Sequence, residues 1–309
     1  MSNLLSHKIA CIIPSYNHAK YIEEAIRSVL RQTLPPERLV IIDDGSQDNS
    51  VDLIRSFNDP RIQLVEQKNQ GAHAALTLGL ELSKDCGLIS VLNSDDRYHP
   101  ERFARCAAFL EEHHDTELVC TRIRLIDESG VPVGQPDGRQ RRLDRIWSNL
   151  RKTTDLVDSL GYGNFTKTTS NFFFRTGAIA AFRPYRFVHD YFAALILAFR
   201  GAVGLIHQDL LDYRVHAANT IKTEGRGAVV QEVIQMHLDL LAELRISLET
   251  DALLRKRLLR YLKIALNNYT DMRAELLILS IARLLSEVRN PTDKLRDFPE
   301  IAEPSTPPP

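Results

Sequence analysis

The sequence predicts an α/β fold, with a mainly parallel sheet that has helices on both faces and a helical extension at the C-terminal end. Over the first 120 residues, short apolar runs alternate with stretches of helical periodicity, and repeated strand–helix–strand units form parallel sheets with right-handed crossovers. The apolar runs are continuous, which is typical of strands that helices cover on both faces. Beyond Gly227 the pattern is helical up to about Val288.

Four apolar runs in this first region have the length of buried strands. They span residues 9–13, 39–42, 62–65 and 88–92. Helices are predicted between them, and the first, over 22–30, has a single apolar stripe of helical spacing. The other helices are expected at 51–57, at 71–83 and after Pro100, because the fixed φ of proline suits the first position of a helix.

The second part of the chain is less regular. Residues 118–133 are predicted to form two short strands around a turn, as a hairpin or an edge extension, and residues 135–165 are polar and irregular. A helix is expected over 189–199, followed by two strand-like pieces at 203–206 and 210–215. The pattern divides the chain into residues 1–120, 121–225, 226–290 and a proline-rich tail, 291–309, which we expect to be disordered.

Charge and cysteine content exclude several classes of protein. The 39 Lys and Arg residues balance 40 Asp and Glu residues, so nothing indicates nucleic-acid binding. No signal-peptide-like stretch precedes the first strand, and the longest apolar segment, 192–206, is too short to span a bilayer. We therefore expect a cytoplasmic protein. The cysteines lack a CxxC pattern and are expected to be buried thiols in a reducing compartment; they are Cys11, Cys86, Cys106 and Cys120.

Polar clusters follow three of the predicted strands, at the edge where open parallel sheets bind ligands. They span residues 15–17, 43–46 and 93–96. We expect them to converge on one crevice. The chain has neither a Gly-x-Gly-x-x-Gly turn nor a P-loop, and two clusters instead hold adjacent carboxylates, Asp43 with Asp44 and Asp95 with Asp96. Such acidic groups would repel a diphosphate unless Mg²⁺ or Mn²⁺ lay between them, which favours a metal clamp. In the alternative, the last cluster only turns the chain and caps the next helix.

These motifs resemble those of the family-two inverting glycosyltransferases of the GT-A fold, which is built on a Rossmann-type sheet. The likeness covers about residues 8–220 and rests on four segments. They are Pro14-Ser15-Tyr16-Asn17, residues 41–46, residues 93–96 with Pro100 downstream, and Tyr213-Arg214-Val215-His216. The resemblance implies metal-dependent transfer of a sugar from a nucleotide-diphosphate donor, with UDP as the expected nucleotide, to an acceptor hydroxyl. The acceptor would be a glycan or a lipid-linked molecule, in polysaccharide or glycan biosynthesis.

By the same resemblance, side chains after the first two strands would bind the nucleoside. Pro14 and Tyr16 would border it, and Asp44, with Asp43 beside it, would contact the base or the ribose. Residues 1–120 would then form the nucleotide-sugar-binding half of the domain, and residues 121–225 the acceptor-binding half.

The third cluster would hold the metal. Asp95 matches the metal-binding carboxylate of the family's Asp-x-Asp motif, whereas the first position of that motif holds Asn93. Asn93 can hydrogen-bond a ribose hydroxyl but brings no charge. Ser94 and Asp96 complete the predicted donor site, and Asp96 can compensate for the missing carboxylate.

Arg214 and His216 alternate along a predicted strand, so their side chains point to the same face. Aimed at the crevice, Arg214 would offset the diphosphate charge and His216 would bind the metal or a phosphate. A structural polar pair under the sheet is the alternative. The other histidines are expected on surfaces or in loops, among them His18, His73, His99, His113 and His114.

An inverting transfer needs a general base that takes the proton of the acceptor hydroxyl. The family places an Asp at the start of a helix after the acceptor region, usually preceded by Glu, and Val188-His189-Asp190-Tyr191 matches that position. Asp190 is therefore the candidate base, and a cap on the following helix is a compatible structural role. His189 stands where the family has an acid, so a contribution from the imidazole stays open.

Residues 252–266 have the pattern of a basic amphipathic helix, which either lies on an anionic membrane surface or packs on its own domain or on a partner subunit. With a lipid-linked acceptor, the protein would act at the inner face of the membrane. Two alternatives to glycosyl transfer remain. One is a nucleotidyltransferase, which usually needs a Gly-rich basic loop after the first strand, and the other is a non-catalytic protein that binds sugar nucleotides.

Overall fold

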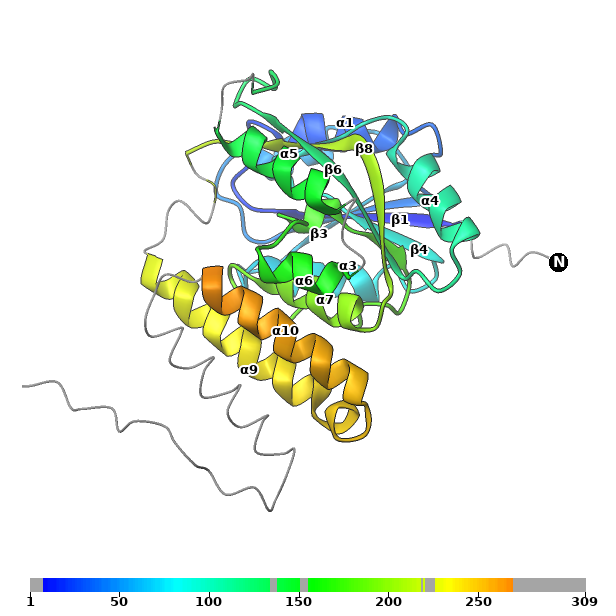
Figure 1. Cartoon of the computed structure of the whole chain (residues 1–309). Coiled ribbons are helices and arrows are strands. Elements are labelled where there is room, and N and C mark those ends of the chain that lie inside the picture. The colour runs from blue at the N-terminus through cyan, green and yellow to red at the C-terminus, as the bar shows by residue number, and fades with distance from the viewer. Residues whose placement is uncertain (1–7, 134–137, 151–154, 218, 220–225, 269–309) are drawn as a thin grey trace, which may run out of the picture.

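The structure of the protein, a computed structural model, describes residues 8–133, 138–150, 155–217, 219 and 226–268. Its centre is an eight-stranded sheet with the strand order β3-β2-β1-β4-β7-β6-β8-β5, which Figure 1 shows between layers of helices. The strands are β1 (Ile9–Ser15), β2 (Arg38–Asp43), β3 (Ile62–Glu66), β4 (Leu88–Val91), β5 (Arg97–Tyr98), β6 (Leu118–Ile126), β7 (Phe173–Arg175) and β8 (Val203–Arg214).

The N-terminal half of the sheet is parallel. β1 pairs with β2 and β4, and β2 pairs with β3, in each case in the parallel sense that repeated strand–helix–strand units predict. The other half is mixed, since β7 runs antiparallel to β4 and β6, while β6 and β8 are parallel. The carboxyl ends of β1, β2 and β4 therefore lie at one edge of the sheet, and the expected α/β fold is confirmed.

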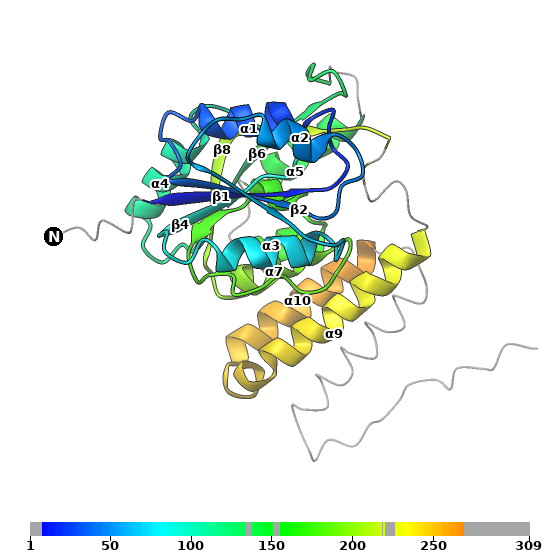
Figure 2. The ribbon, with the colours of Figure 1, turned by 180° about the vertical axis from the view of Figure 1, so that it is seen from behind.

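Helices cover both faces of the sheet, as Figures 1 and 2 show from opposite sides. One face carries α1 (Ile22–Leu30), α2 (Ser50–Arg55) and α4 (Arg102–Glu112), and the other carries α3 (Ala72–Glu81), α6 (Leu156–Gly161) and α7 (His189–Phe199). Successive residues of β1 divide between the two layers: Cys11 and Ile13 join the core under α1 and α4, and Ile12 joins the core under α3. A strand buried on both sides has to be apolar throughout, which explains the continuous run.

Two long helices, α9 (Arg226–Thr250) and α10 (Ala252–Asn268), form the described part of the helical extension and pack against α6 and α7 (Figure 1). Tyr261 of α10 is fully buried, and its hydroxyl lies 3.0 Å from Nε2 of His237 on α9 and 3.3 Å from the hydroxyl of Tyr191 on α7. Arg257 of α10 pairs with Asp155 just before α6, at 2.8 Å. These polar contacts, together with the apolar ones, dock the extension on the sheet domain.

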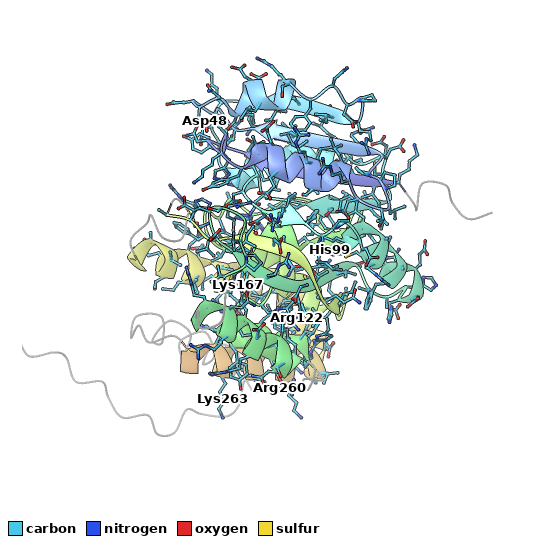
Figure 3. All side chains as sticks on the ribbon, turned by 90° about the horizontal axis from the view of Figure 1, so that it is seen from above. Asp48, His99, Arg122, Lys167, Arg260 and Lys263 are labelled. Atoms are coloured by element: carbon cyan, nitrogen blue, oxygen red, sulfur yellow. The ribbon has the colours of Figure 1, made fainter. Side chains whose placement is uncertain are left out.

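The apolar stripe predicted on residues 252–266 is buried against the protein, because Leu254, Leu258 and Tyr261 are each at most 9% exposed. Of its basic residues, Lys263 points outward from α10 in Figure 3, whereas Arg260 pairs with Asp155 and Asp158 at 2.9 and 2.7 Å. Contact of this helix with a membrane stays a prediction. Its exposed basic side could face a membrane, but its apolar stripe could not, because the stripe is buried within the protein. Within the described residues, no helix is both long and apolar enough to cross a bilayer.

Three local predictions were wrong. Residues 135–165 were expected to be irregular, yet α5 (Gly138–Leu150) and α6 form there, because Leu143, Trp147 and Leu150 give α5 a buried side. Of the two short strands expected over 118–133, the first is the long β6 and the turn lies where it was expected, but the second strand is reduced to a single antiparallel bridge between Ile126 and Pro132. The two pieces expected at 203–215 are one strand, β8, whose register against β6 shifts at Thr121 and Arg122.

The cysteine prediction is confirmed in its structural part, since all four are buried and free. The predicted tail, 291–309, and the last predicted helical turns, beyond residue 268, lie outside the described residues.

Candidate active site

The loops that follow β1, β2 and β4 meet at the carboxyl edge of the sheet. The backbone N–H of Asn17, after β1, donates to Ser46 Oγ, after β2, at 2.9 Å. His18, also after β1, has its Nδ1 hydrogen-bonded to Ser94 Oγ, after β4, at 2.7 Å. The structure therefore brings together the three polar clusters that the sequence places at strand ends.

Asp95 and His216 face each other across this edge, with His216 Nε2 donating to Asp95 Oδ2 at 2.9 Å. Both residues are buried, at 8% and 5% exposed. A nitrogen of His18 completes the group, and the three ligand atoms all lie within 4.8 Å of one another. Burial acts to raise the pKa of Asp95, but the hydrogen bond from His216 and the nearby imidazoles outweigh it, so the pKa is lowered. A carboxylate that stays ionised beside two imidazoles is a donor set that suits a divalent cation.

Asp96 and Arg214 lie behind this group. Asp96 accepts hydrogen bonds from Arg214 N at 2.9 Å and from Ser170 Oγ at 2.6 Å. Burial and the adjacent charge of Asp95 raise the pKa of Asp96 well above its usual value.

The Arg214 guanidinium is 1% exposed, donates to the Asp95 carbonyl at 2.8 Å, contacts Glu24, and lies over the Tyr21 ring at 4.9 Å. Its Nη1 also donates to the carbonyls of residues 127 and 128 at 3.1 Å. The side chains of Asp96 and Arg214 therefore both hold the loop that carries Asp95 in place. Contact of either side chain with a nucleotide-sugar donor remains a prediction.

The two carboxylates after β2, which the sequence predicts to bind the nucleoside, fix the shape of the loops around them. Asp43 accepts from the N–H and hydroxyl of Ser46 at 2.8 and 2.6 Å. Asp44 accepts from the backbone N–H groups of Gln70 and Gly71 at 2.9 and 2.8 Å, and from one side chain, Gln67, at 2.7 Å. The turn between the carboxylates and these donors is possible because the residue after Asp44 is glycine, with φ of 79°.

Pro14 and Tyr16 border the same loops, and Tyr16 is 45% exposed, with its ring free to meet a ligand. Asn93 is less free. Its side-chain amide donates to Thr168 Oγ1 at 2.9 Å and accepts from Thr169 Oγ1 at 3.0 Å. The residue that replaces the first acid of the Asp-x-Asp motif is therefore tied to the segment before β7.

Asp190 occupies the first turn of α7 and is 5% exposed. It accepts from the backbone N–H of Tyr191 at 2.7 Å and from the amide of Asn164 at 2.8 Å. Burial raises the pKa of this carboxyl, although His189 and the two donors act in the opposite direction. His189 Nδ1 lies 3.1 Å from the Tyr185 carbonyl, and burial lowers the pKa of its imidazole. A carboxylate with a raised pKa is a stronger proton acceptor, as general-base chemistry requires.

Residues 164–171, which we call the bracing segment, connect the two parts of the site. Asn164 holds Asp190, Thr168 and Thr169 hold Asn93, and Ser170 holds Asp96. Lys167, in the middle, has a left-handed φ of 64°, which is uncommon for a side chain with a Cβ and often marks a functional segment.

Sequence reasoning missed His18 and the bracing segment. His18 was expected in a loop or on the surface, and it does follow β1 in a loop, but its imidazole is partly buried among the predicted metal ligands. Its place directly after the Pro-Ser-Tyr-Asn motif was the available signal. Two surface hollows lie elsewhere, one between α4 and β8 and one beside Trp147, and neither is lined by a residue of the metal group.

Several known proteins that are similar to this chain are glycosyltransferases. The sequence profile described as Glycosyl transferase family 2 matches residues 10–182. An uncharacterised glycosyltransferase of Nostoc is 27% identical over 73% of this chain and 70% of its own length. Chondroitin synthase of Escherichia coli is 33% identical over 40% of this chain, but only over 18% of its own length.

Among solved structures, S. aureus TarS in complex with UDP-GlcNAc superposes with a TM-score of 0.60 at 17% identity, covering 91% of this chain and 87% of that one. This likeness confirms the GT-A fold that the sequence predicts. The profile match covers more than half of the chain, strand ends and bracing segment included. The chain therefore belongs to glycosyltransferase family 2 and is a glycosyltransferase.

Proposed function

We propose that this enzyme is a divalent-metal-dependent inverting glycosyltransferase that uses a nucleotide-diphosphate sugar, with UDP as the nucleotide. The observation that carries the proposal is the pairing of Asp95 with His216 at the edge where the loops after β1, β2 and β4 meet. The complex of the similarly folded TarS with UDP-GlcNAc supports the choice of donor.

Asp95 and His216 would hold Mg²⁺ or Mn²⁺, because their ligand atoms lie 2.9 Å apart and both side chains are buried at the donor edge. When bound, the cation would neutralise the charge of the diphosphate leaving group. Ser94, hydrogen-bonded to His18, and Asn93 would lie beside the ribose. Pro14, Tyr16 and the loop fixed by Asp43 and Asp44 would enclose the base.

Asp190 would take the acceptor proton as the hydroxyl oxygen attacks the anomeric carbon, and Asn164 would orient its carboxylate. Residues 121–225, which include Asp190 and the bracing segment, would bind the acceptor, whereas residues 1–120 would bind the donor. The acceptor class, a glycan or a lipid-linked molecule in polysaccharide biosynthesis, is part of the proposal. The cytoplasmic location predicted from the sequence is consistent with the four free cysteines.

A thermal-shift screen of UDP-, GDP- and TDP-sugars, each with Mn²⁺ or with EDTA, tests the proposal. A ligand at a hundredfold excess over its dissociation constant should stabilise the fold by about 2.7 kcal/mol. We expect a UDP-sugar to raise Tm only with the metal, and the same sugar to release UDP on turnover. Asp95→Asn should abolish both effects, and Asp115→Asn, an exposed carboxylate before β6, is the control. A UDP-sugar that is turned over equally well in EDTA would refute metal dependence.

A further inference from the structure

His18 shares the buried edge of the sheet with the two predicted metal ligands. Its imidazole meets that of His216 edge to face, with ring centroids 5.8 Å apart. Tyr21 packs on both imidazoles, with its ring centroid 5.0 Å from that of His216 and 6.0 Å from that of His18. The His18 nitrogen, the Asp95 oxygen and the His216 nitrogen that could bind an ion are all within 4.8 Å of one another. Three side chains from three separate loops thus point at one small volume.

The His18 ring is held in place by a group outside this volume. Its Nδ1 is hydrogen-bonded to Ser94 Oγ at 2.7 Å, and Ser94 is 1% exposed. Metal-binding histidines usually use one ring nitrogen for the ion and fix the ring through a hydrogen bond to the other. With the proton on Nδ1 and donated to Ser94, the Nε2 of His18 carries the lone pair that a cation needs.

The separations fit a single ion. In an octahedral site with bonds of about 2.1 Å, neighbouring ligand atoms are about 3.0 Å apart and opposite ones about 4.2 Å apart. Asp95 Oδ2 and His216 Nε2, at 2.9 Å, already match neighbouring positions. His18 can lie opposite only one of these two ligands, so from separations of at most 4.8 Å its nitrogen has to move by up to about 1.8 Å to reach the neighbouring position.

We propose that His18 is a third protein ligand of the metal, and that the resulting two-histidine, one-carboxylate site selects a first-row transition ion such as Mn²⁺ over Mg²⁺. This inference rests on the proposed function, because it concerns the same cation. Mg²⁺ prefers oxygen ligands and keeps its waters, whereas imidazole nitrogen suits transition metals. Three protein ligands would leave positions on the ion for diphosphate oxygens.

The first test is binding, and it does not depend on turnover. The full chain is freed of metal with a chelator and titrated by calorimetry with Mn²⁺ and with Mg²⁺, each with and without UDP. We expect Mn²⁺ to bind at least tenfold more tightly than Mg²⁺. His18→Ala should weaken Mn²⁺ binding tenfold or more. His114→Ala, an exposed histidine before the start of β6, is the matched control and should bind Mn²⁺ as the wild type does.

The second test reads the ligands directly. Pulsed electron paramagnetic resonance of the bound Mn²⁺ should show couplings to two imidazole nitrogens in the wild type and to one in His18→Ala. Because His18 also anchors a loop, His18→Gln is included; its amide can keep a hydrogen bond to Ser94 but supplies no imidazole. Melting curves identify the variant that is folded. The folded variant should lose one nitrogen coupling.

Unchanged Mn²⁺ affinity and unchanged nitrogen couplings in a folded His18 variant would overturn the inference. Equal affinity of the wild type for Mn²⁺ and Mg²⁺, or no Mn²⁺ binding with or without UDP, would overturn it as well. The proposed function fails separately. If the wild type binds Mn²⁺ through two imidazoles but transfers no sugar from any UDP-sugar, the metal site stands and the proposed function does not. If Mg²⁺ supports full transfer and the His18 variants are as active as the wild type, the proposed function stands and the inference about His18 does not.

Discussion

The side-chain amide of Asn164 donates a hydrogen bond of 2.8 Å to Oδ2 of Asp190. Asp190 lies in the first turn of α7, and Asn164 begins the bracing segment, whose later residues hold Asn93 and Asp96. The proposed base is therefore tied to the same piece of backbone as the proposed donor and metal loop. A change at Asn164 should be felt first in the protonation of Asp190.

Replacing Asn164 with Ala should shift the pH dependence of the reaction. The hydrogen bond from Asn164 helps to lower the pKa of Asp190, against burial, which raises it. Without that donor the pKa should rise further, so the acidic limb of the kcat/KM profile should move to higher pH. The profile is measured with saturating metal, and Asn58→Ala, an exposed amide, is the control. If the acidic limb of the profile stays at the same pH, the ionisation of Asp190 does not produce it.

Replacing Asp190 with Asn should remove the base while keeping its shape. We expect kcat to fall by about 10²-fold or more, because general-base catalysis typically contributes 10² to 10⁴. The dissociation constant for UDP, measured by calorimetry, should stay within about twofold, because Asp190 belongs to the part of the chain that we propose binds the acceptor. Near-normal kcat would remove Asp190 as the base, and His189→Gln would then be the next variant to measure.

Replacing Gly45 with Ala should disturb the loop after β2 that we propose encloses the base. Gly45 has φ of 79°, and a Cβ there would lie 3.1 Å from the backbone nitrogen of Asn69. We expect a loss of about 1–2 kcal/mol in the free energy of unfolding, together with weaker UDP binding, because the strained turn carries Asp44. The matched control is Gly227→Ala at the start of α9, where nothing lies within 4 Å of the added Cβ. The control should not lose stability, since Ala is the better helix former. Denaturant unfolding measures the free energy of unfolding of both variants, which should decrease for Gly45→Ala and should not decrease for Gly227→Ala.

The sequence predicted the parallel half of the sheet because its physical signals are local. A strand such as β1, buried on both faces, must be apolar at every position, and the polar residues after it must lie at the carboxyl edge. The same reasoning placed Asp95 near the loops after β1 and β2. The helix α5 was missed because only Leu143, Trp147 and Leu150 are buried in a stretch that is otherwise polar. Those residues pack on β6 and α6, and Trp147 meets the rings of Phe165 and His207, contacts that the sequence pattern does not show.

The bracing segment shows the limit of sequence reasoning at the site. Its Thr and Ser residues have no pattern of their own, and their function as hydrogen-bond partners of Asn93 and Asp96 depends on contacts across more than 70 positions of the chain. His18 was missed for a similar reason. Its place after the Pro-Ser-Tyr-Asn motif is a weak signal of a ligand until Asp95 and His216, 77 and 198 positions away, are seen beside it.

Replacing His237 with Gln should reduce the loss of stability at acidic pH. His237 is buried between α9 and α10, with Nε2 3.0 Å from the Tyr261 hydroxyl, and burial lowers its pKa below the ordinary 6.5. Below about pH 6.5 the unfolded chain then binds more protons than the folded one. The free energy of unfolding therefore decreases as the pH is lowered, by up to about 1.4 kcal/mol per pH unit for this group. The Tm of the variant should fall less than that of the wild type between pH 6.5 and 5. An equal fall in Tm for the variant and the wild type would contradict the prediction. His114→Gln, at an exposed histidine, is the control.

Replacing Arg214 with Lys separates its two proposed roles. The guanidinium reaches the Asp95 carbonyl and Glu24 at once, and the single ammonium of Lys cannot replace both contacts. If bracing is its role, the variant should lose about 2 kcal/mol or more of stability without any ligand, because charged donors and acceptors become unpaired in a buried place. Arg105→Lys, 52% exposed and paired with Glu101 along α4 at 3.3 Å, should change little. If Arg214 instead contacts the diphosphate, Tm without ligand should stay near the wild-type value while UDP binding weakens at least tenfold, and that result would contradict bracing as its main role.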